Sequence, residues 1–380
     1  QVASRQLSNA RQHQQPPRPR YQRQAVACQP VFTRLSGRAA PSVFLATAIC
    51  CMTLTPLVIR YATSRDLLDQ PGGHKSHEAA VPYLGGIAIV ATFVTAVLVV
   101  SIVWPPSGGR NELLTVLGLA TVVSIVGFVD DLRPVSPVWR LIVEIAVSII
   151  VWSMGTGVSV TGIESLDLAL TVLWFVGITN AFNLLDNMDG LAAGLSTITS
   201  LTIFAIAVDT SQFLVAATAI GLAGCTTGFL RHNFHPARIY MGDGGALFIG
   251  FLVAYLGIKL RPEGDRAVSA LIPFVACSVA VFDTTLVTIS RLVRGQSPFL
   301  GGRDHLSHRL VKLGLPVPVA VGTIYFGAVG IGVLTYAING TDARTGAVLI
   351  GLILFTLLVV GGFLLGVDVD PEHSSHADDA

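Results

Sequence analysis

The apolar residues of this chain are gathered into long blocks that contain few charges. Each block is roughly 17 to 22 residues long, which is the length an α-helix needs to cross a hydrocarbon layer about 30 Å thick. The pattern therefore predicts eleven membrane-spanning helices. They lie near residues 40–60, 83–104, 112–129, 138–155, 166–185, 190–208, 211–230, 245–259, 268–289, 317–338 and 344–366.

The connections between the blocks are mostly short, so we expect an all-α, polytopic integral membrane protein with one helical domain over residues 40–366. Residues 1–39 are rich in Gln, Arg and Pro and are expected to form a disordered basic tail; residues 367–380 are expected to form a disordered acidic tail. The composition agrees, because 52% of the residues are hydrophobic and only 12% are charged, about half the charged share of a soluble domain.

The charges indicate an orientation and exclude one class of partner. Lys and Arg number twelve in the odd-numbered connections and five in the even-numbered ones, so the positive-inside rule predicts that the odd connections are cytoplasmic. The arginines of the N-terminal tail argue against this orientation. A net charge of +1 gives no case for nucleic-acid binding. The five cysteines have neither metal-ligand spacing nor a disulfide pattern and are expected to be packing residues.

The unusual polar residues all lie at block ends that border the odd-numbered connections, so they are predicted to meet at one membrane surface. Asp130 and Asp131 end the third block, where two carboxylates repel each other and the helix dipole. A divalent cation or a phosphate-handling role would compensate this repulsion. The plain alternative is a solvated helix end beside Arg133.

Asn183, Asp186 and Asp189 follow at the end of the fifth block, three residues apart, and share one face if they are helical. Carboxylates in an apolar stretch are costly and usually line a cavity. These side chains can accept hydrogen bonds from a base or a sugar, or hold metal-bound water. The spacing does not choose between these roles.

Asp243 stands between glycines in the sequence Met-Gly-Asp-Gly-Gly, residues 241–245. Glycines let the backbone come close to a diphosphate while the carboxylate holds Mg²⁺, and the following helix start offers free N–H groups to anions. The alternative is a bland turn in which Asp243 caps the helix.

Two further loops carry basic residues that could bind phosphate. The first loop places Lys75 and His77 before Pro82 and a Gly-Gly pair at residues 85–86. The loop from residue 291 to residue 312 could instead serve a metal or anionic lipid heads. Its candidate residues are Arg303, His305, His308 and Arg309. Asp283, inside the ninth block, is expected to pair with Arg291 or with another buried polar group.

Taken together and in this order, the motifs between about residue 69 and residue 315 resemble the polyprenyl-phosphate N-acetylhexosamine-1-phosphate transferases of bacterial envelope synthesis, a glycosyltransferase 4 family. The eleven blocks and the His-Leu-Ser-His-Arg-Leu of the last loop are similar to the branch that uses UDP-GlcNAc. Ser307 replaces the middle His of that branch's pattern, and His74 stands where an Arg is common.

The resemblance implies a Mg²⁺-dependent enzyme, with Mn²⁺ as the alternative ion, in the inner (plasma) membrane with a cytoplasmic active site. It would transfer GlcNAc-1-phosphate from UDP-GlcNAc to undecaprenyl or another polyprenyl phosphate and release UMP. Its partners would be a UDP-N-acetylhexosamine, the polyprenyl phosphate, the lipid bilayer and a second copy of the chain in a homodimer.

The resemblance also assigns roles to residues. Asp130 and Asp131 would be catalytic, and Asp243 and Asp130 would hold the metal, although whether Asp130 is a base or orients phosphate stays open. Nucleotide contacts would come from Asn183, Asp186 and Asp189. The phosphates would be held by Lys75, His77, Arg303, His305, His308 and Arg309.

Three alternatives stand beside this interpretation. Within the same class, the chain could be the phospho-MurNAc-pentapeptide transferase of peptidoglycan synthesis. A transporter or lipid carrier needs polar groups near mid-membrane and internal repeats, and the sequence shows no obvious repeat. A non-catalytic scaffold leaves the aspartate motifs unexplained.

Overall fold

The computed structural model describes residues 29–69, 80–103, 108–297 and 302–367. The chain divides into two units, residues 1–41 and residues 42–380. In the described part of the first unit the chain is helical from residue 29. Most of the predicted N-terminal tail, residues 1–28, lies outside the described residues, and its disorder stays a prediction. All contacts discussed below belong to the second unit.

The described residues are almost entirely helical, which confirms the predicted all-α class. One short antiparallel pair of strands joins β1 (Leu68–Asp69) to β2 (Val81–Pro82). The helices are α3 (Gln29–Ser64), α4 (Gly86–Val103), α5 (Arg110–Leu132), α6 (Pro137–Ser153), α7 (Glu164–Leu184), α8 (Leu191–Asp209), α9 (Phe213–Asn233), α10 (Gly242–Lys259), α11 (Arg266–Ala276), α12 (Ser278–Val293), α13 (Leu306–Lys312), α14 (Val317–Ile338) and α15 (Ala343–Leu365).

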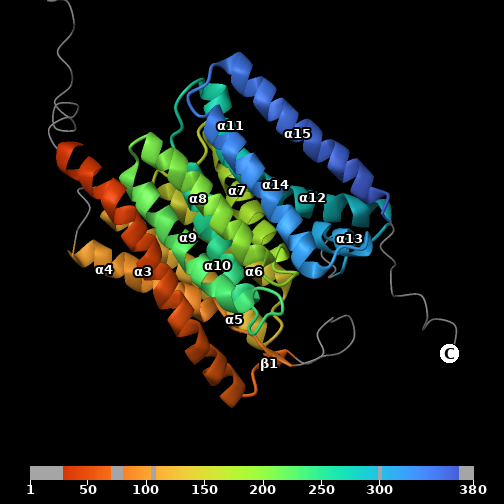
Figure 1. Ribbon diagram of the computed structural model, residues 1–380. Coiled ribbons are helices and arrows are strands. Elements are labelled where there is room, and N and C mark those ends of the chain that lie inside the picture. The colour runs from red at the N-terminus through yellow and green to blue at the C-terminus, as the bar shows by residue number, and fades with distance from the viewer. Residues whose placement is uncertain (1–28, 70–79, 104–107, 298–301, 368–380) are drawn as a thin grey trace, which may run out of the picture. The chain divides into compact units, whose positions relative to one another are not determined.

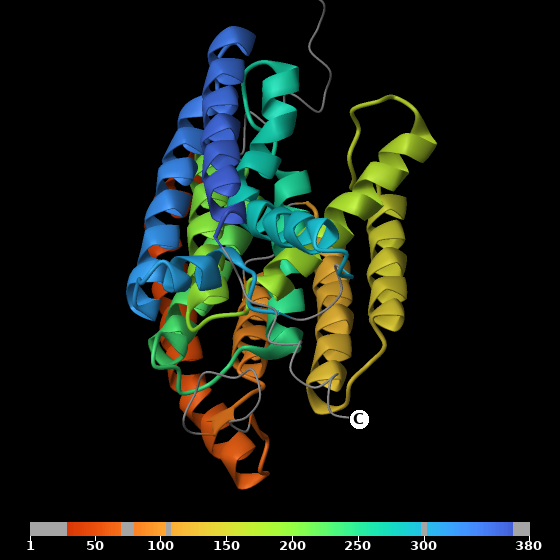
Figure 2. The same cartoon turned by 90° about the vertical axis from the view of Figure 1, so that its right-hand side faces the viewer.

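Each of the eleven predicted apolar blocks lies on one helix or on one helix pair. Among the described residues, nine helices are long and apolar enough to cross a membrane. The pair α11 and α12 would make a tenth span, bent by 68° at the break, and Figure 2 shows α12 running across the direction of its neighbours. The remaining block is α6, which has 17 residues and is one residue shorter than α4.

Helix α10 lies at the centre of the helical unit, in contact with α4, α5, α7, α8 and α9 (Figure 1). In its most apolar stretch 83% of the residues are buried, against 22% in α15, and its mean hydropathy is the lowest of the nine, 1.3 against 2.9 for α15. A helix that faces protein rather than lipid can tolerate glycines and a polar start. This explains how the Asp243 motif is accommodated in a membrane protein.

The C-terminal ends of α5 and α7 meet the N-terminal ends of α6 and α10 at one end of this unit. Close backbone contacts hold α10 there. A Cβ atom added to Gly127 of α5 would lie 2.6 Å from the backbone of Asp243, and one added to Gly86 of α4 would lie 2.4 Å from Gly245 Cα. The N–H groups of residues 85 and 86 also donate to Tyr240 O and Met241 O at 2.9 and 2.8 Å. The glycine pair of the first loop therefore fixes the segment that leads into α10.

Candidate active site

Three side chains from three other helices meet around the guanidinium group of Arg140 in α6. Its Nη1 atom donates to Asp130 Oδ2 at 2.6 Å and to Asp243 Oδ2 at 2.7 Å. Its Nη2 atom donates to Asn183 Oδ1 at 3.2 Å, and Asn183 Nδ2 donates to Asp243 Oδ1 at 2.8 Å. The structure thus brings together three residues that the sequence singled out separately, on α5, the end of α7 and the start of α10.

Asp131 has a different task from its neighbour Asp130. Its two carboxylate oxygens accept hydrogen bonds from the backbone N–H groups of Asp243 and Gly244, at 2.8 and 3.1 Å. Asp131, rather than Asp243, therefore caps α10 and compensates the positive end of its dipole. The contact also needs a glycine at 242, where φ is +75° and a Cβ atom would lie 2.7 Å from the Asp131 carboxylate. The predicted repulsion at the end of α5 is reduced, because Asp130 faces the guanidinium group of Arg140 and Asp131 faces the N-terminal end of α10.

Asp186 lies in the turn after α7, close to the same group of acids. Burial, together with the negative charges of Asp243 and Asp131, raises the pKa of Asp186 to about 7. A backbone hydrogen bond from Gly242 opposes the rise. Near neutral pH the side chain is thus poised between its protonated and ionised forms.

The two other polar residues of this turn are bound to surrounding loops. Asp189 Oδ2 accepts hydrogen bonds from His235 Nδ1 at 2.8 Å and from Ala237 N at 3.0 Å. Asn187 Oδ1 accepts from Ser307 Oγ of α13 at 2.7 Å. The turn between α7 and α8 is therefore held from two sides, and α13 reaches the site through Asn187.

The last loop is organised by buried ion pairs. Arg291 of α12 donates to both carboxylate oxygens of Asp304, at 2.9 and 2.7 Å. Burial favours a higher pKa for Asp304, but the hydrogen bonds and charge of Arg291 outweigh it and the pKa is lowered. Asp283 accepts from His305 Nδ1 at 2.8 Å and from Leu306 N at 2.7 Å. Asp283 thus pairs with the start of α13 and not with Arg291.

His308 is half-buried, and its ring donates a hydrogen bond to the backbone carbonyl of Asn187. Burial and the nearby charges of His305 and Arg303 lower the pKa of His308 to about 4. The imidazole is therefore neutral at pH 7, and the ring nitrogen that donates to Asn187 carries the proton. Its other ring nitrogen can accept one hydrogen bond from a ligand, but the ring offers no positive charge.

The other predicted phosphate ligands differ in whether their side chains are accessible to a ligand. Arg309 is only 1% exposed, and its donors are taken up by Ser290 Oγ and by the backbone oxygens of residues 304, 364 and 367. This arrangement anchors α13 to the end of α15, and it does not support a phosphate contact. Arg303 is exposed and accessible to a ligand. Lys75 and His77 lie outside the described residues.

A divalent metal implied by the resemblance can be tested against these side chains. Among the described residues, no group of three or more His, Cys, Asp and Glu side chains is arranged to hold a metal ion. Mg²⁺, however, is commonly held by one or two carboxylates together with substrate phosphates and water. Asp130 and Asp243 already point their Oδ2 atoms at one cationic nitrogen of Arg140. Two carboxylates and the Asn183 amide form an all-oxygen set that suits Mg²⁺ or Mn²⁺.

Arg140 is a site residue that the sequence analysis did not single out. It was counted only among the twelve Lys and Arg residues assigned to the odd-numbered connections. A signal was present, because it is a cation in the first turn of an apolar block, ten residues after Asp130. Glu144, an acid inside the same block, also went unremarked although ionisable residues within spans are usually functional.

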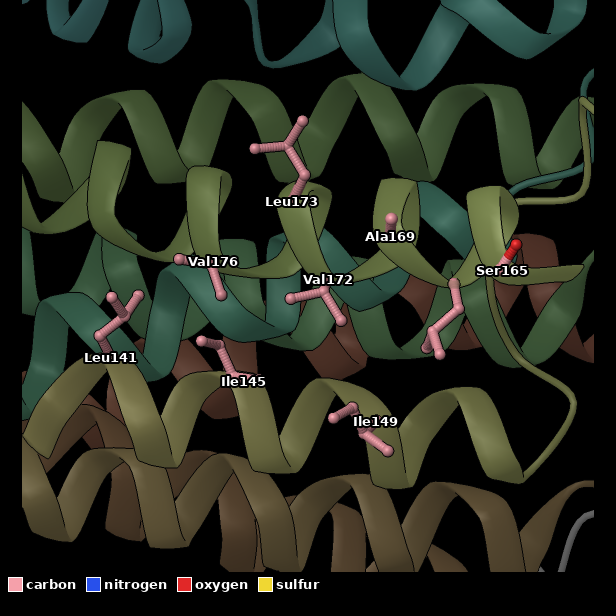
Figure 3. Close-up of a pocket in the computed structure, with 9 residues that line it drawn as sticks. Leu141, Ile145, Ile149, Ser165, Ala169, Val172, Leu173 and Val176 are labelled. Carbon is pink, nitrogen blue, oxygen red and sulfur yellow. The ribbon is translucent and has the colours of Figure 1, made fainter. Parts of the chain in front are cut away.

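An apolar groove runs between α6 and α7. Its volume is about 450 Å³, and Figure 3 shows side chains of both helices facing the gap. Leu141 lines the groove and directly follows Arg140 in the chain. The lining residues are Leu141, Ile145, Ile149, Ser165, Leu168, Ala169, Val172, Leu173 and Val176.

Comparison with known proteins agrees with this geometry. The sequence model of glycosyl transferase family 4 matches residues 113–261, which include the Arg140 cluster. A Bacillus subtilis protein named as a probable undecaprenyl-phosphate N-acetylglucosaminyl 1-phosphate transferase is 32% identical, over 83% of this chain and 88% of its own length. A Mycobacterium tuberculosis decaprenyl-phosphate N-acetylglucosaminephosphotransferase is 30% identical, over 82% and 86%.

A more distant relative comes from the peptidoglycan branch. The phospho-N-acetylmuramoyl-pentapeptide-transferase of Heliobacterium modesticaldum is 34% identical, but over only 55% of this chain and 70% of its own length. The similarity to the N-acetylglucosamine enzymes extends over most of both chains, and it includes the helix ends that build the site. The chain therefore belongs to the polyprenyl-phosphate N-acetylhexosamine-1-phosphate transferases of glycosyl transferase family 4.

Proposed function

We propose that this protein transfers N-acetylglucosamine-1-phosphate from UDP-GlcNAc to a polyprenyl phosphate and releases UMP. The observation that carries the proposal is the Arg140 cluster, together with an apolar groove whose lining includes Leu141, the next residue in the chain. A prenyl chain in the α6–α7 groove would bring its phosphate to the polar end, where Asp130, Asn183 and Asp243 surround a cation.

In the proposed reaction a lipid phosphate oxygen attacks the sugar-linked phosphorus of the donor. A new P–O bond forms there, the bond to the bridging oxygen breaks, and UMP leaves with that electron pair. Both reactants are anionic, so the protein's main tasks are positioning and charge neutralisation. A bound Mg²⁺ would neutralise phosphate charge, with Asp243 and Asp130 as the residues that would hold it.

The remaining residues would act on the nucleotide and the sugar. Asp186 lies in the turn after α7 and His308 contacts that turn, and each offers a hydrogen-bond acceptor. Asp130 would orient the reactants rather than remove a proton, because a phosphate monoester is largely dianionic at pH 7, its second pKa being about 6. Asp189 would act through the 235–237 loop that it holds.

We further propose that the site faces the cytoplasm and that the membrane is the plasma membrane. The excess of Lys and Arg in the connections at the site's end of the helices supports this orientation. A homodimer within the bilayer is part of the same proposal.

The decisive experiment supplies purified protein with undecaprenyl phosphate and Mg²⁺, and with either UDP-GlcNAc or UDP-MurNAc-pentapeptide. UMP release with UDP-GlcNAc is expected, and Asp243→Asn should abolish it. Omission of Mg²⁺ with a chelator should also stop release. Release only with UDP-MurNAc-pentapeptide would assign the chain to the peptidoglycan branch, and no release with either donor would overturn the proposal.

A matched variant tests the groove. Ile145→Gln places an amide among the apolar side chains that face the gap. It should raise KM for undecaprenyl phosphate while KM for UDP-GlcNAc stays near the wild-type value. Leu201→Gln, on a lipid-exposed face of α8, serves as the control because it adds the same amide away from the groove.

A further inference from the structure

A second pair of polar side chains joins α6 to α7 one helical turn from the Arg140 cluster. Glu144 follows Arg140 by four residues, and Asn180 precedes Asn183 by three, so each lies on the same helix face as its partner in the cluster. Asn180 Nδ2 donates to Glu144 Oε2 and to Val176 O. The amide of Asn180 is thereby fixed, and it fixes one oxygen of Glu144.

The other oxygen of Glu144 is unusual. The side chain is 3% exposed, and within the described part of the chain Oε1 has no hydrogen-bond partner. A buried carboxylate with an unused acceptor is costly, and acids inside membrane helices are rare unless they have a function. The hydrogen bond from Asn180 satisfies only one of the two carboxylate oxygens, Oε2.

Arg140 would lose its partners when a metal binds. Its Nη1 atom is bonded to the Oδ2 atoms of Asp130 and Asp243, and these are the oxygens that a divalent cation would take. Charge repulsion disfavours the binding of a guanidinium and a dication to the same two oxygens. Arg140 must then turn to another anion, and Glu144 offers an open acceptor one turn along the same face.

We propose that Glu144 is a positioning residue that receives Arg140 when a divalent cation occupies Asp130 and Asp243. The inference rests on the proposed function, because it assumes that these carboxylates hold a metal. In the metal-free protein Arg140 bridges the two aspartates; with metal bound it pairs with Glu144 Oε1 and stays beside the reactants. Asn180 keeps the carboxylate aimed in that direction.

The test measures binding of Mn²⁺ to the purified full chain without substrates, by the electron paramagnetic resonance signal of free Mn²⁺. Glu144→Gln keeps the acceptor for Asn180 but removes the charge that receives Arg140, so Mn²⁺ binding should weaken by at least about threefold. Arg140→Ala removes the competing cation, so it should bind Mn²⁺ more tightly than the wild type. In the Arg140→Ala background, Glu144→Gln should have no further effect.

Two controls separate this coupling from a general loss of structure. Glu112→Gln changes an acid at the other end of α5, bonded to Thr156, Tyr255 and Lys259, and should leave Mn²⁺ binding unchanged. Glu144→Asp keeps the charge and should weaken binding less than Glu144→Gln. Thermal unfolding verifies each variant, and Glu144→Met replaces Glu144→Gln if that protein does not fold.

Three results would overturn the inference: wild-type Mn²⁺ affinity in Glu144→Gln, an equal effect of Glu144→Gln with and without Arg140, or no Mn²⁺ binding by the wild type. None of these measurements uses turnover. Failure of the proposed function would appear separately, as absence of UMP release from the wild-type protein.

Discussion

At the scale of single residues, Asp130 and Asp131 are adjacent in sequence but belong to different structures. Asp131 caps α10, and Asp130 binds Arg140 and the backbone N–H of Val135 at 2.6 Å. One aspartate therefore builds the site, and the other lies within it.

This division predicts that two similar variants differ in their effect on stability. Asp131→Asn weakens the cap of α10 and should lower the free energy of unfolding by about 1 kcal/mol, with a loss of activity because Asp243 shifts. Asp130→Asn should abolish UMP release with a smaller change in stability. Thermal unfolding in detergent and a UMP assay on both proteins check this; a larger loss of stability in Asp130→Asn would contradict the assignment.

The raised pKa of Asp186 predicts that binding of the donor depends on pH. Its pKa is raised to about 7 by burial and by neighbouring carboxylates, so the side chain is protonated below that pH and ionised above it. If the ionised form accepts hydrogen bonds from the nucleotide, KM for the donor should rise as pH falls, by up to about tenfold per unit below the pKa.

The matched variant is Asp186→Asn, in which this dependence should disappear. A higher Mg²⁺ concentration should move the wild-type dependence to lower pH, since a nearby dication favours the carboxylate. A donor KM that follows the same pH profile in both proteins would exclude Asp186 as the titrating group.

At the scale of elements, α13 connects the loop after α12 to the turn after α7, where the nucleotide is proposed to bind. The hydrogen bond from Ser307 to Asn187 is one of its direct links to the turn after α7. Ser307 departs from the histidine of the related pattern, and its hydroxyl is short enough to be fully buried against that turn.

Ser307→Ala should therefore loosen the turn rather than unfold the protein. Loss of one buried hydrogen bond is worth about 0.5 to 1.5 kcal/mol, so KM for the donor should rise roughly two- to tenfold while KM for the lipid changes little. Ser269→Ala removes a serine hydrogen bond to Glu263 O, far from this turn, and should leave both constants unchanged. Equal effects of the two substitutions would show that Ser307 has no special link to the site.

At the scale of the whole molecule, the helix ends that carry the site share one membrane surface, and orientation decides which compartment it meets. Arg133 follows α5 at the site's end, whereas Ser159 lies in the exposed connection between α6 and α7 at the other end. Single cysteines at these positions, in a background with the native cysteines replaced by serine, distinguish the two faces.

With the site in the cytoplasm, Ser159→Cys should react with a membrane-impermeant maleimide in intact spheroplasts. Arg133→Cys should react only after the cells are opened. The reverse pattern would place the site outside the cytoplasm. Retained UMP release after opening verifies that each labelled protein is folded.

The sequence by itself determined the membrane class, the helix positions and the common surface of the polar motifs. These properties depend on local quantities, since an apolar block must be long enough to cross the bilayer and a charge within it is costly wherever its neighbours lie. The sequence predicted that Asp130, Asn183 and Asp243 lie close together, because all three lie at helix ends that border the odd-numbered connections.

The roles within the site were decided only by the tertiary structure. A polar motif looks the same in sequence whether its side chain faces a ligand, as proposed for Asp130, or a buried carbonyl, as found for Arg309. Arg140 and Glu144 lie inside an apolar block, and their partners come from helices far along the chain. Packing selects these partners, because a buried charge must find its counter-charge in whichever helix the fold places beside it.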